Sequence, residues 1–180
     1  LLKQTAERVL PSSMELGGNA PFIVLEGSDV DRAVDGAMVA KMRNGGSACT
    51  AANRFYVHES ISAEFADKFE VALRGLKIGP GIDESNELGA MVSDKERDKI
   101  LELVGEAENE GAQVTEAGTA PTTGAFLAPR IVRGIEHGSV LTRNEIFGPV
   151  APVVSVSSTD EAVRMANDTE YGLMSYVFAK

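Results

Sequence analysis

The only cysteine of the 180 residues, Cys49, lies in a segment of small residues, 44–54, that opens with Asn44, Gly45 and Gly46. Paired glycines allow positive φ and a close approach of the backbone to a ligand, and small neighbours leave the sulfur sterically open. We interpret Cys49 as a catalytic nucleophile. Free cysteines are also among the most buried residue types, so simple packing is the alternative that this segment leaves open. Residues 44–54 are called the Cys49 loop below.

Composition limits the classes of protein and partner. An apolar content of 43% with 24% charged residues is typical of a globular domain. A net charge of −10 and scattered cations argue against nucleic acid as a partner, and no apolar run approaches the roughly 20 residues that span a bilayer. One cysteine and isolated histidines predict no metal site and fit a reducing, cytoplasmic compartment. We interpret His58 and His137 as surface or packing residues.

The elements around the Cys49 loop follow from apolar spacing and from capping residues. In the first half we predict a helix over residues 2–10, a loop or turn around Gly17 and Gly18, a buried strand over 21–25, a helix capped by Ser28 that runs to Asn44, a strand over 54–58 and an amphipathic helix through 76.

In the second half we predict a long loop over 78–92, a helix from Ser93 to Gly111, a short strand over 113–116, an apolar strand over 150–156, a helix capped by Ser158 and a last strand over 173–179. Strands alternating with helices predict an α/β fold, a mostly parallel open sheet covered by helices. No glycine-rich phosphate-binding fingerprint is present, so a dinucleotide would need residues from outside this chain.

Three motifs in this order and spacing resemble the hallmark segments of the aldehyde dehydrogenases: residues 14–21, 43–49 and 144–150. The resemblance covers essentially the whole chain, including residues 167–173. The amino acids in these motifs are most similar to those of the succinate-semialdehyde dehydrogenases. Ser47 departs from the family, which usually has Gln or Glu there, and this puts the geometry of the Cys49 loop in question.

The resemblance implies a two-stage reaction on a small aldehyde and gives roles to four residues. The Cys49 thiolate attacks the aldehyde carbon, and the resulting hemithioacetal gives a hydride to NAD or NADP, which leaves a thioester. Glu15 then activates the hydrolytic water. Glu145 binds the nicotinamide ribose, and Phe147 helps to seat the nicotinamide half. The backbone N–H of Cys49 supplies one oxyanion donor.

Two further residues have implied binding roles. The backbone of Leu16 approaches the nicotinamide, and Arg43 binds the distal carboxylate of the substrate, a bidentate task that suits a guanidinium. Without the resemblance, Leu16 is only an apolar turn residue and Arg43 only a cation near a helix C-terminus. In the same way, Glu15 and Glu145 are then only solvated acids, and Ile146 and Phe147 are core residues before a Gly-Pro turn.

The resemblance also implies a domain division. We expect residues 1–15 to be a remnant of a cofactor-binding domain and its junction, and residues 16–180 to be an incomplete catalytic domain of a longer, homo-oligomeric enzyme. The chain alone is expected to fold but not to oxidise aldehydes, because most of the cofactor site lies elsewhere. The alternatives are an inactive folded module, another aldehyde dehydrogenase subfamily including a CoA-acylating one, and a cysteine peptidase, which would need a histidine base.

Overall fold

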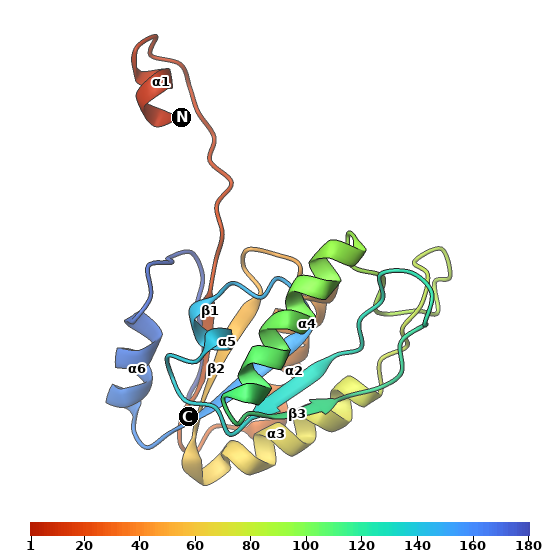
Figure 1. The fold of residues 1–180 in the computed structure, drawn as a ribbon. Helices are drawn as coiled ribbons and strands as arrows, with labels where there is room; N and C mark the ends of the chain where they lie inside the picture. The colour runs from red at the N-terminus through yellow and green to blue at the C-terminus, as the bar shows by residue number, and fades with distance from the viewer.

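The computed structural model describes residues 1–180 and contains one six-stranded sheet in the order β3-β4-β5-β2-β1-β6 (Figure 1). The pairs β1/β2, β1/β6, β2/β5 and β4/β5 are parallel, and only the β3/β4 pair is antiparallel. The predicted mostly parallel open sheet is therefore confirmed. The strands are β1 (Ala20–Val24), β2 (Ala52–His58), β3 (Gln113–Glu116), β4 (Arg130–Arg133), β5 (Val150–Val156) and β6 (Tyr176–Phe178).

Helices cover both faces of the sheet. Buried residues of α2 and α3 pack on one face, and those of α4, α5 and α6 pack on the other. A short α1 stands away from the sheet at the end of an extended segment (Figure 1). The helices are α1 (Leu2–Ala6), α2 (Val30–Ala37), α3 (Glu59–Arg74), α4 (Asp94–Asn109), α5 (Val140–Arg143) and α6 (Thr159–Asn167). None of them is both long and apolar enough to cross a membrane.

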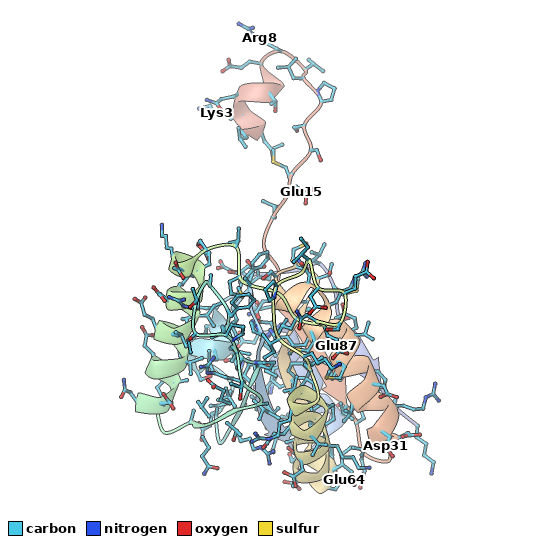
Figure 2. The ribbon with its side chains drawn as sticks, turned by 90° about the vertical axis from the view of Figure 1, so that its right-hand side faces the viewer. Lys3, Arg8, Glu15, Asp31, Glu64 and Glu87 are labelled. Atoms are coloured by element: carbon cyan, nitrogen blue, oxygen red, sulfur yellow. The ribbon has the colours of Figure 1, made fainter.

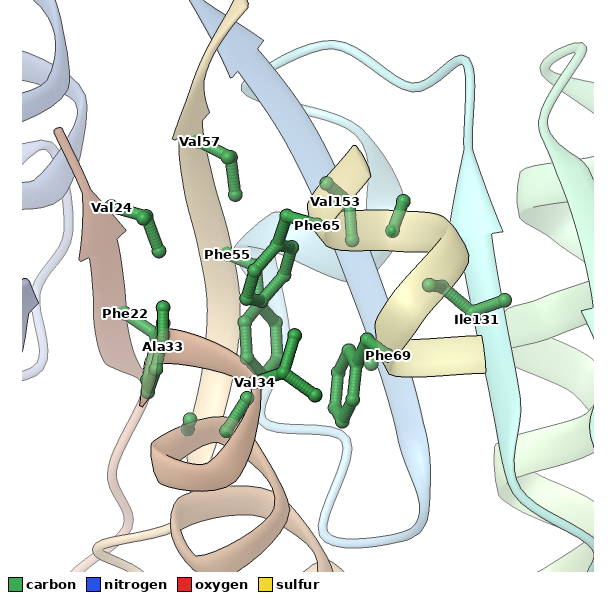
Figure 3. Close-up of a cluster of buried hydrophobic side chains, with 14 of the residues drawn as sticks. Phe22, Val24, Ala33, Val34, Phe55, Val57, Phe65, Phe69, Ile131 and Val153 are labelled. Atoms are coloured by element: carbon green, nitrogen blue, oxygen red, sulfur yellow. The ribbon is translucent and has the colours of Figure 1, made fainter. Parts of the chain in front are cut away.

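An aromatic cluster joins the sheet to α2 and α3 (Figure 3). The ring centroids of Phe22 and Phe55 lie 5.1 Å apart, and those of Phe55 and Phe69 lie 5.5 Å apart. Successive strand residues point to opposite faces, so Ile23 and Tyr56 belong to the second core instead. Burial on both faces explains why the central strands read as continuous apolar runs.

Three helix caps were predicted, and the structure confirms two of them. The Ser93 and Ser158 hydroxyl oxygens accept from the third backbone N–H of α4 and α6, at 3.3 and 3.2 Å. The predicted Ser28 cap of α2 is wrong, because Asp29 accepts from the Arg32 N–H at 3.1 Å. The Ser28 hydroxyl instead lies 2.7 Å from the Leu25 carbonyl and 2.9 Å from the Phe178 carbonyl, where it ties β1 to β6.

Both ends of the chain differ from the prediction. α1 ends at Ala6 rather than before Pro11, because Val9 has a φ of 52°, which no right-handed helix accommodates. None of the residues of α1 is buried. The last strand is confined to Tyr176–Phe178, shorter than the predicted 173–179.

Candidate active site

The three motifs meet because each of them precedes one of three adjacent parallel strands. Gly18 lies just before β1, Cys49 just before β2 and Glu145 before β5, and the sheet places β5, β2 and β1 side by side. Ala20 pairs with Ala52 in the first of these ladders. The amino ends of parallel strands share one edge of a sheet, so the motifs converge at that edge.

The helix that leads to the Cys49 loop changes its winding before it ends. α2 stops at Ala37 and continues as a π-helix, η1 (Met38–Met42), followed by a 3-10 turn, η2 (Arg43–Gly46). The predicted extent of this helix is nearly right, but its geometry is not α-helical throughout. Short π-helical segments occur frequently at functional sites. Three successive residues of η2 then take positive φ: Asn44 at 53°, Gly45 at 61° and Gly46 at 75°.

Hydrogen bonds and a backbone contact hold the Cys49 loop against the third motif. A Cβ at Gly46 would lie 2.3 Å from the Gly148 carbonyl oxygen, so only glycine allows this approach. The Asn44 amide donates to the Ser47 carbonyl at 2.7 Å, and the Ser47 hydroxyl donates to the Phe147 carbonyl at 3.2 Å. Ser47 therefore contributes a direct link between the loop and the third motif.

Gly17 and Gly18 form no turn, because neither has positive φ and the segment before β1 is extended. Their importance is steric. A Cβ at Gly18 would lie 1.9 Å from the Cys49 carbonyl oxygen, and one at Gly17 would lie 2.7 Å from Glu145 Oε2. The Gly18 N–H donates to Glu145 Oε1 at 2.8 Å. The first motif is thus wedged between the Cys49 loop and the Glu145 carboxylate.

A buried amide network lies beneath these contacts, and sequence reasoning missed it. Asn53 Nδ2 donates to Asn19 Oδ1 at 2.6 Å and to the Asn144 carbonyl at 2.9 Å. Asn19 Nδ2 donates to the Thr142 carbonyl at 3.0 Å. Asn53 Oδ1 accepts from the Ile146 N–H at 3.3 Å. The available signal was the polar pair Asn53 and Arg54 directly before the apolar part of β2, since buried polar groups need partners.

Lys41 is the second residue that was missed. It lies in η1, its side chain is fully buried, and its ammonium donates to Asn53 Oδ1 at 3.4 Å. Burial lowers the pKa of the Lys41 ammonium to about 7. Lysine is almost never buried in this way without a charged partner, so this position is a candidate for a functional role.

The structure places Glu145 and Phe147 at the site. Glu145 is half-buried, and its carboxylate faces the glycine pair as described above. Phe147 has a φ of 56° and is 39% exposed, so it is not the core residue that the alternative interpretation assumed. Ile146 between them is buried, as that interpretation expected.

Glu15 lies on the segment that leaves the sheet (Figure 2), and Leu16 is the next residue along that segment. Glu15 is exposed and forms no hydrogen bond or salt bridge, and Leu16 is 74% exposed. The structure therefore does not bring the Glu15 carboxylate into contact with Cys49. It does bring the chain three residues later, at Gly18, directly onto the Cys49 backbone.

Arg43 lines a cavity of about 880 Å³ that also borders the Cys49 loop. Its guanidinium is exposed and makes no salt bridge, and its backbone leaves the helical region with a ψ of 128°. Ala48 and Thr50, the two neighbours of Cys49, line the same cavity, and Asp35 and Tyr176 lie on its other walls. The cavity thus connects Arg43 with the residues that flank the cysteine.

Neither histidine is bonded to Cys49. His58 caps α3 and contacts Ser60, while His137 joins the buried Tyr56 hydroxyl to Asp168 through hydrogen bonds of 2.8 Å. A cysteine peptidase would need a histidine hydrogen-bonded to the nucleophile. No group of three or more His, Cys, Asp or Glu side chains is arranged to hold a metal ion.

Comparisons with known proteins agree with the geometry. The model of the aldehyde dehydrogenase family matches residues 1–180. A succinate-semialdehyde dehydrogenase of Paenarthrobacter nicotinovorans is 44% identical over 182 residues, which are 100% of this chain and 40% of that protein. A 3-sulfolactaldehyde dehydrogenase of Pseudomonas putida is 40% identical over 181 residues, 100% of this chain and 37% of that protein.

Solved structures give the same result. The crystal structure of a succinate-semialdehyde dehydrogenase from Burkholderia pseudomallei matches with a TM-score of 0.94 at 37% identity, over 99% of this chain and 37% of that one. The chain therefore spans about two fifths of the length of the curated relatives that it matches.

The contact between Gly18 and Cys49 predicts that an alanine destabilises the chain at position 18 but not at a glycine with open space around it. Gly18→Ala should lower the free energy of unfolding by about 1–3 kcal/mol, because its Cβ meets backbone that cannot rotate away. The matched control is Gly105→Ala in α4, where no atom lies within 4 Å and alanine should instead stabilise by roughly 0.5–1 kcal/mol. Urea unfolding of both variants measures the difference, and equal effects would contradict the contact.

Proposed function

Because this chain belongs to the aldehyde dehydrogenase family, we propose that it is the catalytic part of an enzyme that oxidises succinate semialdehyde to succinate with NAD or NADP. In this proposal residues 1–15 are the junction to a cofactor-binding domain, which agrees with an α1 that buries nothing. Residues 16–180 form the catalytic domain. A nucleophilic thiol must stay reduced, so a cytoplasmic location fits the free Cys49.

One observation supports the proposal most: the three motifs converge on Cys49. Gly18 packs on the Cys49 carbonyl, and Glu145 accepts a hydrogen bond from the Gly18 N–H. Gly46 packs on the Gly148 carbonyl. Segments that are distant in the sequence thus build one surface around a partly exposed thiol.

The residues at this surface fit the nicotinamide end of a dinucleotide. Leu16 and Phe147 offer exposed apolar surface in the motifs that carry Gly18 and Glu145, and they are 74% and 39% exposed. A carboxylate suits the ribose hydroxyls, and the missing side chains at Gly17 and Gly18 let the first motif pack closely against the Cys49 backbone and the Glu145 carboxylate. A bound oxidised nicotinamide supplies the hydride acceptor.

Cys49 performs the covalent step in this mechanism. Its thiolate attacks the aldehyde carbon and forms a tetrahedral hemithioacetal, whose oxyanion the Cys49 N–H stabilises. Loss of hydride from that carbon leaves an acyl thioester on the sulfur. Ala48 and Thr50, the neighbours of Cys49, line the cavity that Arg43 also lines, and Cys49 itself is partly exposed.

Glu15 releases the product by accepting a proton from the water that attacks the thioester. Its position supports this role indirectly, because the chain reaches the Cys49 backbone three residues later. The carboxylate is exposed on the extended segment here (Figure 2), so the role requires that segment to lie along the Cys49 loop in the longer enzyme.

Arg43 defines the proposed substrate class. Its guanidinium lines the same cavity as the neighbours of Cys49 and is not neutralised by a salt bridge, so it is available to an anion. The relatives named for succinate semialdehyde and 3-sulfolactaldehyde act on aldehydes whose distal group is anionic. A distal carboxylate on Arg43 would orient the aldehyde carbon toward the thiol.

The first functional prediction concerns the nucleophile. Cys49→Ser in the full-length enzyme should abolish aldehyde oxidation and leave cofactor binding largely intact, because a hydroxyl without a base is a poor nucleophile. Steady-state turnover and a cofactor-binding titration on the same variant measure both. Turnover above a few per cent of the wild type would remove Cys49 from the mechanism.

The second concerns the base. Glu15→Gln should slow hydrolysis of the thioester more than hydride transfer, so a stoichiometric burst of reduced cofactor should precede a slow steady state. Stopped-flow absorbance of the reduced nicotinamide measures the burst. Glu7→Gln, on the same N-terminal segment, is the control and should behave as the wild type. Loss of the burst in Glu15→Gln would mean that Glu15 acts before hydride transfer.

The third concerns substrate selectivity. Arg43→Ala should raise the KM for succinate semialdehyde by about one to two decades, the loss of a charge-assisted hydrogen bond worth roughly 1.5–3 kcal/mol. The KM for an uncharged aldehyde of similar length should change little. The control is Arg74→Ala, whose guanidinium pairs with Glu70 on α3. Equal losses on both aldehydes would contradict the proposed substrate class.

A further inference from the structure

Lys41 is a buried cation with almost no hydrogen-bond acceptors or opposite charges around it. Its side chain has 0% exposure and takes part in no salt bridge. Its single hydrogen-bond acceptor is Asn53 Oδ1, at the long distance of 3.4 Å. An ammonium has three protons to donate, so most of its hydrogen-bonding capacity is unused.

No charged side chain pairs with Lys41 to compensate for its burial, and the nearby cation and site carboxylate have other surroundings. Arg43 lies two residues after Lys41 and is exposed. Arg54 on β2 donates to the carbonyls of Asn19, Met165 and Ala166, and Glu145 accepts from the Gly18 N–H. Desolvation alone lowers the pKa of Lys41 to about 7.

A buried ammonium with one long hydrogen bond and no ion pair opposes folding. Replacing a poorly compensated buried charge by an apolar side chain of similar volume is often neutral or stabilising. Stability therefore gives no reason for lysine here, and the reason must lie in what the ammonium contacts.

That contact is the central amide of the site. Asn53 Oδ1 faces two groups that only donate, the Lys41 ammonium and the Ile146 N–H. On its other side, Asn53 Nδ2 faces the carbonyl oxygens of Asn19 and Asn144. The amide thus joins the segments that precede β1 and β5, and Lys41 reaches it from the helix that leads into the Cys49 loop.

We propose that Lys41 is a positioning residue for the reaction of Cys49: it fixes the orientation of Asn53, and through Asn53 the spacing of the Glu145 segment and the Cys49 loop. This role rests on the proposed function. Lys41 touches neither substrate nor cofactor in it. The thiol, the oxyanion donor and the carboxylate that faces Gly18 keep their mutual geometry because the amide between their segments cannot rotate.

The test is Lys41→Met, which keeps the length and apolar stem and removes the donor. In the 180-residue chain it should raise amide hydrogen exchange at Ile146 and Gly18 roughly tenfold, the effect of losing about one hydrogen bond. Exchange at Val57, in the middle of β2, should not increase, and the melting temperature should stay the same or rise. Lys95→Met, at an exposed position of α4, is the matched control and should change none of these.

In the full-length enzyme the same variant should lower kcat about tenfold and change the KM for the aldehyde by less than about twofold, because positioning acts on the reaction step rather than on binding. The exchange measurements need no turnover. Failure of the Cys49→Ser test would therefore reject the proposed function without affecting the exchange result, and the two failures remain distinguishable.

The pH dependence of stability tests the burial of the Lys41 ammonium, on which the proposal rests. The pKa of Lys41 is about 7 in the folded chain and 10.5 as its ordinary value, so between these values the unfolded chain binds more protons. The free energy of unfolding should therefore rise with pH from about 7 to 10 more steeply in the wild type than in Lys41→Met. Urea unfolding at several pH values measures the two slopes.

Three outcomes would overturn the proposal. A lower melting temperature with uniformly faster exchange would make Lys41 a structural residue only. Unchanged exchange at Ile146 would show that the ammonium does not bear on Asn53. Identical pH slopes would show that Lys41 is not buried as an uncompensated ammonium.

Discussion

The site depends on two places where backbone meets backbone with no room for a Cβ. Gly18 lies on the Cys49 carbonyl and Gly46 on the Gly148 carbonyl. Neither contact belongs to a strand ladder, yet together they set how far apart the ends of β1, β2 and β5 sit. Any side chain at either glycine must displace backbone, so the spacing of the thiol and the Glu145 carboxylate is fixed sterically before any hydrogen bond acts.

Buried polar side chains then hold together the segments that the glycine contacts bring close. Asn53 and Asn19 are almost fully buried, and each makes hydrogen bonds to the strand-preceding segments around it. A fully satisfied buried network specifies one arrangement, whereas an incomplete one is costly. The network here is complete at the amides and incomplete at Lys41, whose ammonium has one long hydrogen bond. The molecule therefore accepts a loss of stability at the point nearest to the Cys49 loop, which is expected where function opposes stability.

Sequence reasoning succeeded where the determinants are local and failed where they are not. The alternation of strands and helices and the Ser93 and Ser158 caps depend on neighbouring residues, and the structure confirms them. The Gly18 hydrogen bond to Glu145 spans 127 positions, and the Asn53 hydrogen bond to the Asn144 carbonyl spans 91. No periodicity reports such contacts. The glycine pair was predicted as a loop or turn and does lie in a loop, but its close packing on the Cys49 and Glu145 segments was not predicted.

The edge of the sheet at which the motifs meet has an electrostatic consequence. Ligand sites of open α/β sheets usually lie at the carboxyl ends of the strands, where helix N-termini favour anions. Here Cys49 and Glu145 lie at the amino ends, and the helical segments that precede Cys49, η1 and η2, arrive with their C-termini. A helix C-terminus carries partial negative charge and disfavours a thiolate. The cations Lys41 and Arg43 are placed at this terminus, where they oppose its dipole. Under the proposed function, a thiolate at this edge would therefore be favoured by side-chain cations such as Arg43 rather than by a helix dipole.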